Sequence, residues 1–233
     1  MCMTKLRFNT YNEHQGAAAQ RMQDHRFFKY FGRHPMELVN RYLLQRMFSS
    51  REFVALLNDA LTRLKDDKHK DVVRCILRDE IPADKPTHFE NLIRDLTSPQ
   101  IGITETQIHV ARMGPHTEAA IAEMHRILKV DLDNPNHDLV ILALLHTAGE
   151  RLVSVEYGHI VGRFSLDGAN SVFYHPHFRQ DAAEGDHSTL FDVAIQGLLT
   201  RDEALETAKA AIDKATEVRL SFFSQFKLPD SYF

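Results

Sequence analysis

The sequence contains the stretch Phe173-Tyr-His-Pro-His-Phe-Arg-Gln-Asp-Ala-Ala-Glu-Gly-Asp-His187. Read as a helix, this stretch puts His177, Asp181 and Glu184 on one face, because they are spaced by four and three residues. The same face continues through apolar positions such as Phe191 and Ile195, so it should point into a protein core. Buried ligand-type side chains need partners. The question for the rest of the chain is whether it supplies the other half of a metal site.

The composition narrows the class of protein, its partners and its location before any motif is considered. The chain has 233 residues, 43% hydrophobic and 26% charged, which is typical of a soluble globular protein with one domain. A formal charge of -4 and the lack of a basic block argue against nucleic acid as a partner. We find no apolar run long enough for a membrane span and no secretory signal. With two cysteines in no metal-binding pattern, a cytoplasmic location is the simplest expectation.

Helical periodicity dominates the chain, and we find no convincing strand or domain boundary. We expect helices at about residues 10–31, 36–47, 49–64, 72–81, 87–97, within 100–115, 117–130, 134–164, 171–199 and 200–227. Capping boxes at residues 49–52 and 200–203 are expected to begin two of them. Seven or more helices with short connections predict a single all-α domain over residues 1–233, with its core at about 35–225.

The long helix at 134–164 carries Glu150 in the middle of its apolar stripe. An ionised carboxylate in that position needs a partner, and a metal ion is the strongest one. The alternative is a structural salt bridge to an arginine from another helix. Glu156 falls off this stripe, so we expect it at the edge of the stripe or exposed.

Two further candidates flank a short break that contains two prolines. Glu80 ends an apolar stripe, and His88 begins the next helix. Taken alone, Glu80 reads as a helix-end carboxylate in water, and His88 as a core histidine bonded to a carbonyl. The full candidate set is Glu80, His88, Glu150, His177, Asp181 and either Glu184 or His187. Carboxylates with a few histidines from separate helices of a bundle are the ligands of di-iron or di-manganese centres.

The order of these motifs resembles the haem-oxygenase-like di-iron oxidases and oxygenases, which share a seven-helix fold with haem oxygenase and the TenA thiaminases. The similarity rests on three features over about residues 35–225. Asp79-Glu80 is followed after seven residues by His88, Gly149-Glu150 precedes Tyr157 by seven, and His177-x3-Asp181 follows an aromatic pair. The family motif continues with a histidine where this chain has Glu184. Either Glu184 is the ligand, or the helix distorts near Gly185 so that His187 reaches the metal.

The resemblance implies two Fe(II) ions that react with O2 as co-substrate. It implies a small-molecule substrate, with N-oxygenation, oxidative C–C cleavage or alkene or nitrile formation as reactions, in specialised biosynthesis. Because dimers are common in this fold family, it also admits a homodimer. An amino acid or amine derivative is our expected substrate, since polar and aromatic residues lie near the expected pocket. They are His146, Tyr157, Tyr174 and Arg74.

Three other functions compete with this one. A metal-independent enzyme of the same fold, similar to TenA or PqqC, would need a nucleophile such as Cys75, which faces away from Glu80 on its predicted helix. A haem-binding relative would use His25 or His34 as axial ligand and would leave the carboxylates unexplained. A non-catalytic helical binding module would explain the fold but not the inward-facing acids and histidines.

Overall fold

The structure of the protein is a computed structural model that describes residues 2–180 and 187–227. Its helices are α1 (Cys2–Asp24), α2 (Arg26–Lys29), the 3-10 turn η1 (Phe31–Arg33), α3 (Met36–Arg63), α4 (Asp67–Glu80), α5 (His88–Leu96), α6 (Glu105–Val110), α7 (Pro115–Ile127), α8 (His137–Leu145), the π-helical η2 (His146–Arg151), α9 (Leu152–Phe164), α10 (Tyr174–Gln180), α11 (His187–Leu198) and α12 (Asp202–Phe223). These residues contain no strand, so the all-α prediction is confirmed.

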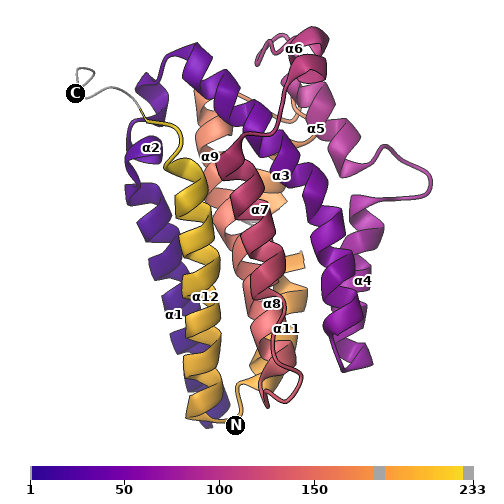
Figure 1. Cartoon of the computed structure of the whole chain (residues 1–233), viewed down its shortest axis with the longest axis vertical. Coiled ribbons are helices and arrows are strands. Elements are labelled where there is room, and N and C mark those ends of the chain that lie inside the picture. Colours follow the sequence, from indigo (N-terminus) through magenta and orange to yellow (C-terminus); the bar gives the residue numbers. More distant parts are fainter. Residues whose placement is uncertain (1, 181–186, 228–233) are drawn as a thin grey trace.

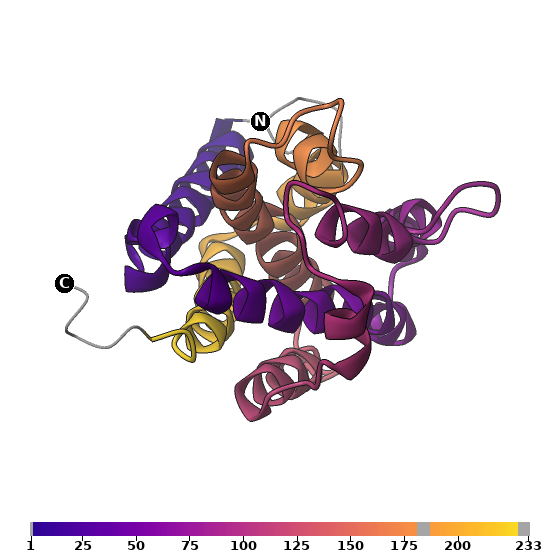
Figure 2. The same cartoon turned by 90° about the horizontal axis from the view of Figure 1, so that it is seen from above.

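The segment α8–η2–α9 lies inside the bundle. Helix α12 packs against α8, α1 and α7, and α1 and α12 run side by side (Figure 1). Seen from above, the other helices surround this segment (Figure 2). Nearly every side chain of α8 is buried, which matches its apolar sequence on all faces. No helix in the described ranges has the length and apolar character that crossing a membrane requires.

An aromatic cluster joins the end of the first helix to the core. Phe27, Phe28 and Phe31 are fully buried and pack on Tyr42 of α3 and Phe223 of α12. The sequence predicted one first helix over about residues 10–31, which includes this cluster. In the structure α1 begins at Cys2 and ends at Asp24, and two separate short turns, α2 and η1, carry the cluster.

The predicted helix boundary at residues 49–52 is wrong, because α3 runs from Met36 to Arg63 without a break. Ser49, the predicted cap, lies inside this helix, and the Oγ of the next residue, Ser50, accepts a hydrogen bond from Arg46 at 2.7 Å. The apolar stripe continues across this point, and Leu43, Met47 and Leu57 are all buried. Tertiary burial along a whole stripe outweighs a local capping signal.

The second predicted capping box, at residues 200–203, is also wrong. The residue before α12 is Arg201, and no side chain caps the helix there. Instead Arg7 from α1 donates to Asp202 at 2.7 Å and to the Thr200 carbonyl at 2.9 Å. The sequence-based helix at about 171–199 corresponds to α10 and α11, and residues 181–186 lie outside the described residues.

Candidate metal centre

Five of the seven residues predicted as metal ligands line a single cavity, which we call the histidine–carboxylate cavity. They are Glu80, His88, Glu150, His177 and His187. Each comes from a different element, namely α4, α5, η2, α10 and α11. The cavity has a volume of about 60 Å³, enough for a few water molecules. The remaining two predicted ligands, Asp181 and Glu184, lie outside the described residues.

The break between α4 and α5 brings Glu80 and His88 together. Glu80 is the last residue of α4, and His88 is the first residue of α5. Thr87 and Glu90 form a capping box that begins α5 at this point. As a result, His88 Nδ1 lies 3.0 Å from Glu80 Oε1, and both side chains are largely buried. Neither residue is a solvated helix-end group.

His177 faces His88 across the cavity, with 4.7 Å between the ring centroids. Its Nδ1 donates to the backbone carbonyl of Phe173 at 2.6 Å. A carbonyl oxygen can only accept a hydrogen bond, so Nδ1 carries the proton and Nε2 keeps the lone pair in the neutral ring. This backbone contact is the usual way in which a protein orients a metal-binding imidazole.

His187 connects the cavity to α4. Its Nε2 lies 2.8 Å from Asp79 Oδ2, and its Nδ1 lies 3.8 Å from Glu150 Oε1. An ideal helix through both residues would put His187 about 80° from His177. His177 belongs to α10 and His187 to α11, and residues 181–186 between these two elements lie outside the described residues. Asp79, the residue before Glu80 in the chain, is a direct partner of a candidate ligand.

The donors of the cavity are arranged in pairs. Within the described ranges, no three His, Cys, Asp or Glu side chains form a group that could hold a metal ion as they stand. The pairs are Glu80 with His88 and Glu150 with His187, and His177 lies beside the first pair. Two carboxylates and three imidazoles fit an iron centre in chemical kind.

Glu150 lies in a π-helical segment that the sequence did not reveal. The turn His146–Arg151 interrupts the expected long helix, and such turns are frequent at functional sites. Gly149 allows a close approach there, because a Cβ atom on it would lie 2.8 Å from the Phe53 ring. The changed hydrogen-bond register separates residues that a regular helix would put on one stripe. Glu150 lines the cavity, whereas His146 does not.

The four residues predicted to contact substrate lie in different places in the structure, and only one of them lines the cavity. Tyr157 lines the cavity, where burial raises the pKa of its hydroxyl well above the ordinary value. Arg74 is exposed and pairs with Asp71 at 2.8 Å. Tyr174 is fully buried behind the cavity, 5.4 Å from Tyr157 between ring centroids. Neither of these two, nor His146, lines the cavity.

Sequence reasoning missed a buried ion network beside the cavity. Glu156 was expected at the edge of its stripe or exposed, but it is 0% exposed. Its Oε2 accepts from Arg46 Nε at 2.7 Å, and its Oε1 lies 3.1 Å from Arg219 Nη1. Arg46 also donates to the Tyr157 hydroxyl at 3.1 Å. A salt bridge to arginine, of the kind considered for Glu150, is present at Glu156. A lone acid in the apolar run of residues 152–161 was the available signal.

Asp95 was missed as well, although it fixes the helix that carries His177. It lies near the end of α5, with 2% of its surface exposed. Its carboxylate accepts hydrogen bonds from the amides of Val172, Phe173 and Tyr174, at 2.8, 3.0 and 2.9 Å. Ser171 adds a hydroxyl bond at 2.5 Å. One end of α5 therefore provides His88, and the other end caps α10.

His146 makes the stability of the fold depend on pH. The ring is fully buried between the Tyr11 hydroxyl, 3.0 Å from Nδ1, and the Ser188 hydroxyl, 2.9 Å from Nε2. Burial, and then the positive charge of Arg151, hold its pKa well below the ordinary value. Below a pH of about 6.5 the unfolded chain binds a proton that the folded chain does not, so stability should fall as pH falls, by up to about 1.4 kcal/mol per unit.

A His146→Gln variant should therefore show a smaller loss of stability between pH of about 7.5 and 5.5, measured by urea unfolding. The quantity to compare is the change of the unfolding free energy with pH. The absolute value falls at every pH, because the variant also loses the hydrogen bonds of His146. His109→Gln, at an exposed site, is the control. An unchanged slope in the His146 variant would contradict the prediction. Asp192 nearby has a pKa raised by burial, so its own titration lowers stability as pH rises, which is opposite in sign to the effect of His146.

Comparison with known proteins supports the fold. No family model matches the chain, and no curated protein matches it in sequence. Among solved structures, a CADD-like protein of unknown function from Nostoc punctiforme has a TM-score of 0.71 at 12% identity, covering 93% of this chain and 96% of that one. A domain of unknown function with a heme oxygenase-like fold from Shewanella denitrificans has a TM-score of 0.70 at 13% identity, covering 94% and 90%.

A TenA homolog from Pseudomonas syringae has a TM-score of 0.67 at 13% identity, covering 94% of this chain and 91% of that one. Likeness at such low identity shows the fold and nothing about the reaction. The chain therefore has the all-α haem-oxygenase-like fold that TenA homologues share.

Proposed function

We propose that this protein is a non-haem di-iron enzyme that uses O2 to oxidise a small molecule. The observation that carries the proposal is that five ligand-type side chains, from five separate elements, line one cavity. Glu80, His88, Glu150, His177 and His187 would hold the two Fe(II) ions. Asp181 and Glu184 remain candidates for the same centre. When bound, the iron supplies the O2 chemistry, which no amino-acid side chain provides.

The surrounding residues orient the donors and give part of the cavity an apolar lining. Phe53, Phe89 and Phe173 contribute aromatic surface to its lining. The Tyr157 hydroxyl accepts a hydrogen bond from Arg46 and keeps its own proton, which it can donate to a bound substrate. His177 presents Nε2, because Nδ1 is occupied by the Phe173 carbonyl. These residues would bind and orient the substrate. The substrate must be small, because the histidine–carboxylate cavity is small.

An amino acid or amine derivative remains our proposed substrate class, with N-oxygenation, oxidative C–C cleavage or alkene or nitrile formation as candidate reactions. The competing functions find less support. Cys75 does not line the cavity, so the described residues of its lining include no thiol for a TenA-like mechanism. His34 Nε2 donates a hydrogen bond to the backbone carbonyl of Phe27 at 2.7 Å. This nitrogen is therefore engaged, and His34 lies far from the proposed ligands in the sequence.

Titration with ferrous iron under anaerobic conditions tests the proposal. We expect about two Fe(II) ions bound per chain, and a transient visible absorption after mixing with O2 and substrate. His177→Ala should lower iron affinity at least about tenfold, since it removes a ligand. His175→Ala is the matched control on the same helix, because the His175 ring lies against Gly168 and does not line the cavity.

Two results would refute the proposal. The first is iron binding no stronger than that of an unrelated protein of similar charge. The second is equal iron binding by the His177→Ala and His175→Ala variants, with both variants folded by circular dichroism. Glu184→Ala and His187→Ala, compared in the same titration, would identify the last ligand.

A further inference from the structure

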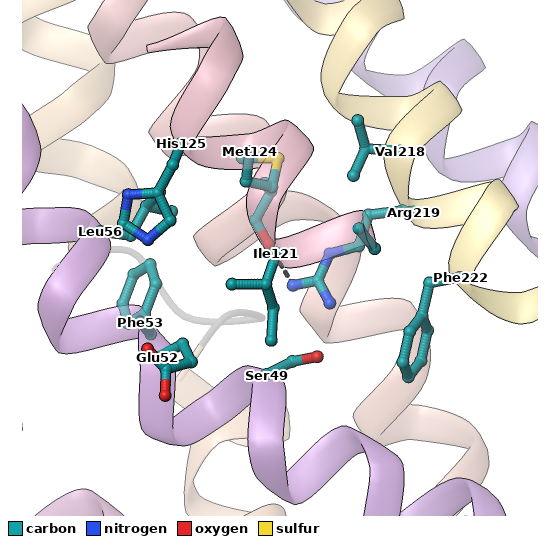
Figure 3. A pocket seen from close by; sticks show the side chains of 12 residues that line it. Ser49, Glu52, Phe53, Leu56, Ile121, Met124, His125, Val218, Arg219 and Phe222 are labelled. Atoms are coloured by element: carbon teal, nitrogen blue, oxygen red, sulfur yellow. Dashed lines mark hydrogen bonds between the residues drawn. The ribbon is translucent and has the colours of Figure 1, made fainter. Parts of the chain in front are cut away.

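A second cavity lies next to the histidine–carboxylate cavity. We call it the apolar chamber; it has a volume of about 70 Å³ and lies between α3, α7 and α12. Figure 3 shows Phe53 and Leu56 of α3 near Met124 and Ile121 of α7, with Val218 and Phe222 of α12 on the other side. Its surface is mainly carbon, and nothing in the proposed iron chemistry accounts for it.

The two cavities share part of their walls. Ser49, Phe53 and Arg219 line both of them. They also meet along η2, where Ala148 faces the chamber and Gly149 and Glu150 face the histidine–carboxylate cavity. The Phe53 ring lies directly against Gly149, where no side chain separates the two. The Phe53 ring is therefore part of the wall between the two cavities.

The ionisable side chains that line the chamber already have partners, and among them Glu52 Oε1 lies 3.5 Å from Arg51 Nε. Arg219 donates to the Ala148 carbonyl and pairs with Glu156 (Figure 3 shows its guanidinium among the lining side chains). His125 Nδ1 lies 3.1 Å from Asp59 Oδ2. Charged groups that are engaged in this way have little left to offer an ionic ligand. The chamber should therefore select an uncharged, apolar group.

The size of the chamber limits that group. A cavity of about 150 Å³ binds benzene, and the chamber has about half that volume. It suits a branched aliphatic group of about three or four carbons better than an aromatic ring.

We propose that the apolar chamber binds the branched aliphatic side chain of the substrate, an α-amino acid or a related amine, whose polar end lies in the histidine–carboxylate cavity. This inference rests on the proposed function, because it assigns the second half of the same substrate. It also predicts binding without iron, since the chamber consists of protein side chains only.

The methyl group of Met124 provides a direct probe. Protein labelled with 13C at its methionine methyl groups, in the metal-free form, is titrated with L-leucine and separately with glycine. Met124 lines the chamber, whereas the buried Met22 and Met47 do not. We expect millimolar L-leucine to shift the Met124 signal and leave Met22 and Met47 in place. Glycine, which has no side chain to bury, should bind at least about tenfold more weakly.

Two matched variants complete the test. Ala120 lines the chamber, and its neighbour Ala119 is exposed on the same helix. Ala120→Leu should fill the chamber and abolish the L-leucine shift, while Ala119→Leu should retain it. Neither variant should change iron binding, so failure here is distinguishable from failure of the iron proposal. No Met124 shift with L-leucine, or an equal shift in the Ala120→Leu variant, would overturn the assignment.

Discussion

Replacing Glu156 by glutamine should lower the free energy of unfolding by about 3–5 kcal/mol, because the change leaves buried arginines without their carboxylate. Arg46 and Arg219 both contact Glu156 in the folded protein, and the Tyr42 hydroxyl donates to it at 3.1 Å. Glutamine has nearly the same volume, so the loss reports charge and hydrogen bonding rather than packing. The expected decrease in Tm is roughly 6–20 °C.

Urea unfolding followed by circular dichroism measures this loss. Glu217→Gln is the control, since Glu217 is exposed on α12 and should change stability by less than about 0.5 kcal/mol. Equal stabilities of the two variants would show that Arg46 and Arg219 do not depend on Glu156. Because Arg46 also holds the Tyr157 hydroxyl and Ser50 at the cavity, the Glu156 variant should weaken substrate binding as well.

Replacing Asp95 by asparagine should cost about 2–3 kcal/mol of stability and lower Fe(II) affinity about tenfold. Its carboxylate accepts three backbone amides and one hydroxyl at the start of α10. Asparagine lacks the charge and one of the acceptor oxygens, so part of this cap is lost. The first turn of α10 then becomes less fixed relative to α5, and with it the position of His177 relative to His88.

The two readouts separate a positioning role from a purely structural one. Asp84→Asn, at an exposed site between α4 and α5, should change neither stability nor iron affinity. If Asp95→Asn lowers stability but binds iron as tightly as the original protein at a temperature where both are folded, Asp95 does not position His177. Loss of stability and of iron affinity together supports the positioning role of Asp95. Recovery of iron affinity in an Asp95→Glu variant would strengthen that conclusion.

Local patterns were sufficient for much of the fold. The apolar spacing of α8 and α9, the break at Pro82 and Pro86, and the capping residue Thr87 all act over a few residues. For that reason α5 and the Glu80–His88 pair follow closely from the sequence. Where a local signal competed with a long buried stripe, as at Ser49 in α3, the stripe decided the structure.

The candidate site could be predicted as a set of residue types but not as an arrangement. An ideal helix assigns faces by a fixed angle per residue, and η2 changes that register between His146 and Glu150. For this reason His146 was grouped with Glu150 although it lies with Tyr11 and Ser188. Burial of Glu156 depends on arginines more than 60 residues away in the chain, so no local pattern could reveal it.

The stretch at residues 173–187 shows the same division. By itself, the sequence determined that His177 lies on an inward-facing helix and that a histidine follows ten residues later. Only the tertiary structure decided that His177 faces His88, that Asp95 caps its helix, and that His187 lies between Asp79 and Glu150. The physical reason is range: helical periodicity is set by neighbours within a turn, whereas a site is made by side chains that meet across the core.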